Sequence, residues 1–120
     1  MDKLYLTQKG QESTIYPLEK TAVTIGRLPD NDIVLPDESV SSRHARLERI
    51  AAGWQIVDLN STNGTYLNQQ ALEANKPHPW QAHIPLFIGP YTLLWEPKIT
   101  VESVSPKPLV QSTGPTNLRN

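Results

Sequence analysis

The sequence contains no cysteine, and this absence excludes several classes of protein at once. A chain without cysteine forms no disulfide, offers no thiolate to a zinc ribbon and has no thiol nucleophile. The sequence also lacks an apolar run near the roughly 18 residues of a membrane helix, and no signal-peptide core follows Met1. We therefore expect a cytoplasmic protein without direct membrane insertion. At 120 residues the chain suffices for one domain, either alone or beside further domains of a longer protein.

An excess of charge of either sign is missing as well. The chain has 11 Lys and Arg against 12 Asp and Glu, which leaves a net charge of −1. Nonspecific binding to nucleic acid needs a basic face, so we expect no nucleic-acid partner. The hydrophobic fraction of 38% supports one core and leaves room for polar loops.

Amphipathic helices of ordinary length are not apparent, and short apolar runs between turn residues take their place. Many short strands at close spacing are typical of an all-β, antiparallel β-sandwich or barrel. The expected strands cover residues 3–7, 13–18, 21–25, 32–35, 44–50, 54–59, 65–67, 84–88 and 91–95. We expect residues 68–79 to be irregular, because Pro77 and Pro79 fall there. Residues 1–97 form the predicted domain, and residues 98–120, rich in Pro, Ser and Thr, are predicted to be a flexible tail or interdomain linker.

Three polar clusters each follow an expected strand. The first is Gly26-Arg27, where arginine offers a planar fork of donors that suits phosphate. The second spans residues 41–44 and carries two serine hydroxyls and a histidine. The third spans residues 58–68 and contains Asn63-Gly64, a strong hairpin-turn signal. Each cluster also has a plain interpretation, namely a solvated charge, a simple turn or, for the histidine, a structural role.

The third cluster contains more polar groups than a tight turn requires. Ser61 and Thr62 precede Asn63, and we expect both hydroxyls to point outward as donors. Hydroxyls, a side-chain amide and free backbone N–H groups in one loop favour binding of an anion or a peptide backbone.

Four segments, taken in order and spacing, resemble one known family. Ile25-Gly26-Arg27, Asn31–Leu35, Val40–Ala45 and Asp58–Asn68 together resemble the forkhead-associated (FHA) domain, with a likeness that extends over roughly residues 3–96. The family fold is a β-sandwich of about eleven strands, related to the SMAD fold. The family binds phosphothreonine peptides, so the resemblance implies that the partner is a phosphothreonine-containing protein or peptide.

The resemblance also implies a role for each matching residue. Contacts to the phosphate fall to Arg27, Ser41 and Thr62, and a contact to the peptide backbone falls to Asn63. Ser42 stands where the family often places a further phosphate or peptide contact. Structural support of the site falls to Gly26, His44 and Gly64.

The sequence departs from the family at a few positions. Ser39 and Ser42 stand where many relatives carry a basic or amide side chain that helps select the residue after the phosphothreonine, which leaves that selection open. Asn60 replaces a common glycine, and we expect the turn to survive because asparagine tolerates the left-handed region. Residues 76–83 depart from the usual Gly-Asp entry to a strand.

Enzymatic alternatives have little support in the sequence. Ser41 or Ser42 near His44 suits a hydrolase only if an acid and a Gly-x-Ser-x-Gly elbow are present, and neither is apparent. His78 and His83 lie among prolines without a carboxylate or cysteine cluster, so we expect neither a metal site nor a cofactor.

Two alternatives without an enzyme remain. The same sandwich can serve as a phosphate-independent interaction or oligomerisation module. In that case Trp80, Tyr91 and Trp95 would form an exposed patch, although burial in the core is favoured for most of them. A phosphothreonine of the chain itself, at Thr7, Thr113 or Thr116, would occupy the site in an autoinhibited form.

Overall fold

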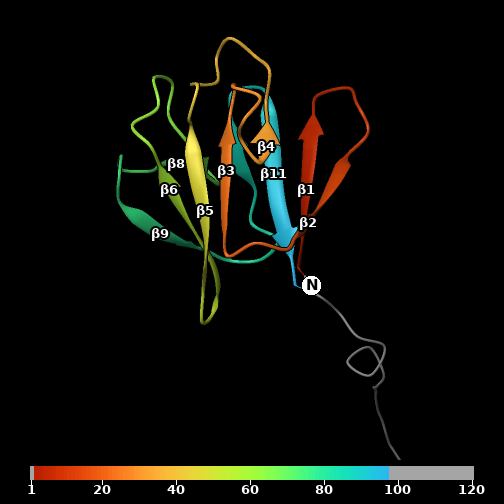
Figure 1. Cartoon of the computed structure of the whole chain (residues 1–120), viewed down its shortest axis with the longest axis vertical. Helices are drawn as coiled ribbons and strands as arrows, with labels where there is room; N and C mark the ends of the chain where they lie inside the picture. Colours follow the sequence, from red (N-terminus) through yellow and green to blue (C-terminus); the bar gives the residue numbers. More distant parts are fainter. Residues whose placement is uncertain (1, 98–120) are drawn as a thin grey trace, which may run out of the picture.

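Eleven short strands in two sheets make up residues 2–97 of the computed structural model (Figure 1). The structure describes residues 2–97, so the predicted tail, with Thr113 and Thr116, lies outside the described residues. Within this range there is no helix, and hence none long and apolar enough to cross a membrane. The predicted all-β sandwich is confirmed, and the count of eleven strands agrees with the family resemblance.

The first sheet has six strands in the order β2-β1-β11-β10-β7-β8. Its members are β1 (Asp2–Gln8), β2 (Thr14–Leu18), β7 (Tyr66–Leu67), β8 (Gln70–Ala71), β10 (Leu86–Ile88) and β11 (Tyr91–Glu96). The N-terminal and C-terminal strands of the domain pair antiparallel over six residues, from Lys3 with Glu96 to Gln8 with Tyr91. This pairing closes the fold by joining its two ends.

The second sheet has five strands in the order β4-β3-β5-β6-β9. Its members are β3 (Ala22–Gly26), β4 (Ile33–Val34), β5 (Ala45–Ile50), β6 (Gly53–Asp58) and β9 (Pro77–Trp80). The pairs are antiparallel except for β3 with the two-residue β4, which run parallel. The parallel pair brings the residues that follow β3 and β4 to the same end of the sheet.

Alternation of buried and accessible residues places the core between the two sheets. In β11, Tyr91, Leu93 and Trp95 are buried while the residues between them are partly accessible. In β5, Ala45 and Leu47 have no exposed surface. Side chains at alternate positions point to one face of a strand, so each sheet contributes one apolar face to the common core.

The three tryptophans are buried, and each indole N–H has a hydrogen-bond partner. Trp54 donates to the Asp2 carboxylate over 2.8 Å, and Trp80 donates to the Ile84 carbonyl over 2.7 Å. Trp95 donates to the Trp80 carbonyl, also over 2.7 Å. Trp80, Trp95 and Tyr91 are at most 6% exposed. The favoured assignment of these aromatic residues to the core is therefore confirmed, and they form no surface patch.

The expectation of an irregular segment at residues 68–79 is wrong. The strands β8 and β9 lie in that segment, and β9 pairs with β6 from Val57 with Pro77 to Trp54 with Trp80. The pairing is compatible with proline because β9 is an edge strand, where a residue without an N–H is tolerated on the solvent side. Pro77 and Pro79 are two residues apart, so both missing donors fall on the same side of the strand.

Three polar loops gather at one end of the sandwich, at the top of Figure 1. They follow β3, β4 and β6, and hydrogen bonds join them. The Arg27 N–H donates to the Ser41 carbonyl over 3.0 Å, and the Thr62 N–H donates to the Ser41 hydroxyl over 2.9 Å. The three loops thus converge in the folded domain. The order of strands along the sequence does not by itself predict this convergence.

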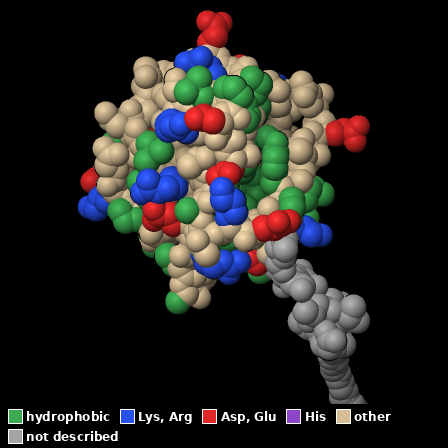
Figure 2. Space-filling view, viewed as in Figure 1, with side chains coloured by type: hydrophobic (Ala, Val, Ile, Leu, Met, Phe, Trp, Pro, Cys, Tyr) green, Lys and Arg blue, Asp and Glu red, His purple; other side chains and the backbone are tan. Residues whose placement is uncertain are grey.

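The face shown in Figure 2 carries Lys and Arg side chains interspersed with Asp and Glu side chains. On the second sheet, Arg46 and Glu48 of β5 form an ion pair with a contact of 2.6 Å. Nonspecific binding to nucleic acid requires a broad basic surface, and this face does not provide one.

The corrected assignment of β9 leads to a stability prediction. We expect Trp80→Ala to lower the free energy of unfolding by about 3–5 kcal/mol, because it opens a large cavity in the core. Pro79→Ala, on the exposed side of the same strand, should change it by less than about 1 kcal/mol. Urea unfolding followed by circular dichroism gives both values. A loss below about 1 kcal/mol for Trp80→Ala would contradict the placement of this segment in the core.

Candidate functional site

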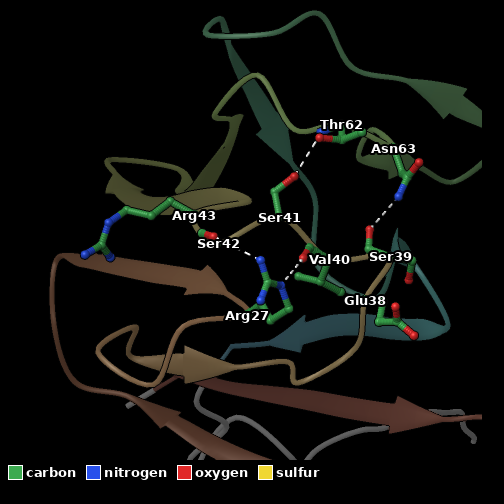
Figure 3. Close-up of a pocket in the computed structure, with 9 residues that line it drawn as sticks. All are labelled: Arg27, Glu38, Ser39, Val40, Ser41, Ser42, Arg43, Thr62 and Asn63. Carbon is green, nitrogen blue, oxygen red and sulfur yellow. Dashed lines mark hydrogen bonds between the residues drawn. The ribbon is translucent and has the colours of Figure 1, made fainter.

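A cleft of about 430 Å³ opens where the three loops meet (Figure 3). It contains all five residues that the sequence singled out for ligand contact, together with four others. The lining residues are Arg27, Glu38, Ser39, Val40, Ser41, Ser42, Arg43, Thr62 and Asn63. Their side chains or backbone form the floor and rim of the cleft, and no apolar pocket of the kind that holds a small hydrophobic ligand is present among them.

Arg27 supplies the positive charge of the cleft. Its Nε–H donates to the Val40 carbonyl over 3.1 Å, and one Nη2–H donates to the Ser42 hydroxyl over 3.2 Å. A guanidinium has five N–H groups, so these two bonds leave three for a ligand. No carboxylate within residues 2–97 forms an ion pair with Arg27. The side chain is therefore held in position while its charge remains unneutralised.

Three hydroxyl groups line the same cleft as the guanidinium. The Ser41 hydroxyl accepts the N–H of Thr62 over 2.9 Å, and the Ser42 hydroxyl accepts from Arg27. A hydroxyl that accepts through oxygen keeps its own proton to donate. The Thr62 side chain is exposed at the upper rim of the cleft. The cleft thus presents hydroxyl donors and cationic N–H donors toward the same space, which suits an anion with several acceptor oxygens.

Gly26 lets the first two loops approach each other closely. A Cβ atom at this position would collide with the Ser42 carbonyl oxygen and would lie 2.8 Å from the Asn31 amide nitrogen. The same Asn31 nitrogen donates to the Ser42 carbonyl over 2.9 Å and to the Leu28 carbonyl over 2.8 Å. Gly26 thus supports the site through this close approach, and Asn31, which the family resemblance included without a role, supports it as well.

His44 is fully buried and joins the second loop to the third. Its Nδ1 accepts the Ser41 N–H over 3.0 Å, and its Nε2 lies 2.9 Å from the Gly64 carbonyl. Because Nδ1 accepts, the ring is neutral and carries its proton on Nε2, which donates to Gly64. Burial lowers the pKa of His44 below its ordinary value, although the Gly64 carbonyl and the nearby Asp58 oppose that shift. The structural role expected for His44 agrees with these contacts.

The third loop is built around the buried carboxylate of Asp58. That carboxylate accepts the Ser61 N–H over 3.1 Å and also the hydroxyls of Ser61 and Thr65. The Ser61 hydroxyl in turn accepts the Gly64 N–H over 3.0 Å. The expectation that Ser61 points outward is therefore wrong, because its hydroxyl is used inside the loop. Only Thr62 of the pair faces the cleft.

Two residues of this loop adopt the left-handed backbone that the turn requires. Asn60 has a φ of 59° and Gly64 a φ of 89°. Asparagine pays little for this conformation compared with other residues that carry a Cβ, so the turn survives the replacement of glycine at position 60. The structural role expected for Gly64 follows from its φ and from its two hydrogen bonds.

The two ends of the cleft differ. At one end the Asn63 amide nitrogen donates to the Ser39 carbonyl over 2.8 Å, which ties the third loop to the second. At the other end Arg43 points away from Arg27 (Figure 3). It pairs with Asp30, and its other terminal nitrogen lies 3.3 Å from the Asn31 side-chain oxygen. Arg43 therefore stays at the margin of the anion-binding centre.

The predicted site residues thus lie together in one place. Three further residues that shape the cleft or its charge were not singled out from the sequence. Asp58 organises the third loop, Asn31 fixes the second, and Glu38 adds a negative charge to the rim. Asp58 opens the third cluster in the sequence, so a carboxylate three residues before a Ser-Thr-Asn-Gly turn was the available signal. Glu38 gave no signal, because it stands in a polar loop without a pattern.

Comparison with known proteins gives one consistent result. The family model of the FHA domain matches residues 23–83, which is just over half of the chain. One relative is the FHA domain-containing protein FhaB of Mycolicibacterium smegmatis, 42% identical over 67 residues. That match covers 56% of this chain and 43% of the relative. The chain therefore spans less than half the length of this relative.

Solved structures show the same likeness. Mycobacterium tuberculosis EmbR in complex with a low affinity phosphopeptide is 29% identical with a TM-score of 0.69, over 78% of this chain and 24% of that one. The FhaA FHA domain complexed with the intracellular domain of Rv3910 is 26% identical with a TM-score of 0.66, over 78% of this chain and 99% of that one.

The neutral, buried state of His44 leads to a prediction of pH dependence. The folded-state pKa is lower than the ordinary value of 6.5, so below pH 6.5 the unfolded chain binds a proton that the folded chain resists. The contribution of His44 to the free energy of unfolding is therefore fully present above pH 6.5, and it is lost as the pH falls toward the folded-state pKa. We expect the free energy of unfolding of His44→Gln to fall less between pH 7.5 and 5.5 than that of the wild type.

Chemical unfolding at a series of pH values measures this difference. His83→Gln is the matched control, since His83 lies on the surface and its replacement leaves His44 in place. Titration of the carboxylates that contact neither histidine is common to all three proteins and cancels in the comparison. Identical pH profiles for wild type and His44→Gln would show that the imidazole is not held in its neutral form by the fold.

Proposed function

The chain belongs to the FHA domain family, and from this premise we propose that it is a phosphothreonine-dependent peptide- and protein-binding module. In this proposal it acts in the cytoplasm and has no catalytic activity of its own. Arg27, Ser41 and Thr62 hold the phosphate, Ser42 adds a contact, and Asn63 holds the peptide backbone. Residues 1–97 form the binding domain in the same proposal.

One observation carries the proposal, namely an arginine that is fixed in position and yet has no carboxylate partner in the described domain. Arg27 is held by the Val40 carbonyl and the Ser42 hydroxyl, and this fixes the direction of its free N–H groups before a ligand arrives. A cation that serves only solubility does not need such bonds. A cation that binds phosphate benefits from them, because less side-chain freedom is lost on binding.

The hydroxyls add direction to the charge. A phosphothreonine carries about −1.5 to −2 charges at neutral pH and three strong acceptor oxygens. Hydrogen bonds to a charged group contribute roughly 1.5–3 kcal/mol each. A few such bonds, less the free energy needed to order a flexible peptide, lead to affinities around the micromolar range, about −8 kcal/mol. Removal of the phosphate should eliminate most of this binding.

The relatives guide the choice of ligand, and they do not identify the partner. EmbR has been solved with a phosphopeptide and the FhaA domain with another protein, which supports phosphopeptide and protein ligands for this chain. The match covers 43% of FhaB, so the activity of a longer protein is not carried over. The proposal therefore concerns the domain and its ligand class.

The direct test is calorimetric titration with a degenerate pool of phosphothreonine peptides. We expect binding to the wild type, weaker binding of a phosphoserine pool, and no binding of the unphosphorylated pool. Arg27→Ala should weaken the phosphothreonine interaction about ten-fold or more, which is roughly 1.4 kcal/mol or above, because the charge and three donors are lost.

Arg46→Ala is the matched control. It removes the same charge from β5, where Arg46 pairs with Glu48 outside the cleft, and it should leave the affinity unchanged. Equal affinity for the phosphorylated and unphosphorylated pools, with a folded domain, would refute the proposal.

A further inference from the structure

One end of the cleft carries a negative charge that phosphate binding does not use. Glu38 lines the cleft on the same side as Ser39 and Asn63, away from Arg43. Its side chain is exposed, and it has no hydrogen bond or ion pair with any residue of the described domain. In Figure 3 its carboxylate points away from Arg27. The cleft therefore has a positive centre and a separate negative end.

The loop that carries Glu38 is held firmly on both sides. The Asp37 carboxylate accepts the Ser39 N–H over 2.9 Å as well as the Ser39 hydroxyl, and the Val40 N–H donates to the Asp37 carbonyl over 2.9 Å. The bond from Asn63 to the Ser39 carbonyl then ties this loop to the third loop. The backbone of Glu38 thus has a defined place relative to the phosphate donors, and its side chain projects from that place.

The negative charge of Glu38 distinguishes between negative and positive groups of a bound peptide. It repels a second negative group that lies near this end, and it attracts a positive one. Ser39, the neighbouring residue on the loop, is too short to reach far along a peptide, so Glu38 is the long side chain available at this end. Asn63, which contacts the Ser39 carbonyl at the same end of the cleft, offers no charge to compensate.

We propose that Glu38 is a specificity-determining residue, which selects partners with a lysine or arginine within a few residues of the phosphothreonine. The inference rests on the proposed phosphothreonine binding and adds the class of partner, a segment with a phosphate and a basic side chain. Exposed ion pairs are weak, so the gain from the basic residue is roughly two- to five-fold in affinity. Salt reduces it, because the pair is in contact with solvent.

The test uses the full 120-residue chain and a set of phosphothreonine peptides with one variable position. Lysine, alanine or glutamate is placed in turn at each of the four positions on either side of the phosphothreonine, and dissociation constants are measured by fluorescence anisotropy. For the wild type we expect lysine to bind more tightly than glutamate at one position or at adjacent positions. Glu38→Gln should remove this preference, and Glu38→Lys should reverse it.

The ratio of lysine to glutamate affinities is the decisive quantity. A charge change near the cleft alters the affinity for every phosphopeptide, and this common effect cancels in the ratio. Glu12→Lys makes the same charge change in the β1–β2 turn, outside the cleft, and should keep the wild-type ratio. An unchanged ratio in Glu38→Gln and Glu38→Lys would overturn this inference while phosphothreonine binding stands. Failure of the all-alanine phosphopeptide to bind in a phosphate-dependent way would overturn the proposed function itself.

Discussion

The imidazole of His44 holds the loops of the cleft in a fixed relation, and the site depends on it. One ring nitrogen accepts the Ser41 N–H while the other donates to the Gly64 carbonyl. The backbone of the same residue donates to the Ile25 carbonyl and accepts from Leu59, both over 2.9 Å. A single buried residue thus contacts the ends of β3 and β6, the second loop at Ser41 and the third loop at Gly64. Only a neutral ring can donate at one nitrogen and accept at the other, so the protonation state of His44 is part of the architecture.

Support and ligand contact overlap only in part in this cleft, at Asn63 and Ser41, which also tie the third loop to the second. The residues that shape the loops, such as Asp58 and Asn31, have their polar atoms satisfied inside the protein. The residues that face the cleft, Arg27 and the hydroxyls beside it, retain donors that only water or a ligand can satisfy. Preorganised donors lose little freedom when a ligand replaces that water. Fold stability and anion binding can therefore be altered separately by mutation, which is useful for experiments.

The sequence allowed much of the fold to be predicted, because alternating burial is a local pattern. The inward positions of β11 follow from short-range rules. The hairpin signal at Asn63-Gly64 is wrong, because β6 and β7 belong to different sheets and only Gly64 of the two residues has a positive φ. The clustering of the loops does not, because it rests on contacts such as that of Thr62 with Ser41, 21 residues apart in the chain; only the family resemblance implied it. The proline rule failed at β9 because it depends on whether a strand lies at an edge. Ser61 was misjudged because composition does not tell which way a hydroxyl turns when a buried carboxylate competes for it.

The central claim is that phosphate is bound where Arg27, Ser41 and Thr62 meet, and backbone amide NMR tests it most directly. A phosphothreonine peptide should shift the amide signals of these residues and their neighbours, while the β5–β6 turn at the opposite end of the sandwich (Figure 1) stays unchanged. The unphosphorylated peptide at the same concentration should cause no such shifts. Shifts of equal size with both peptides, or shifts centred on the outer face of either sheet, would contradict the account.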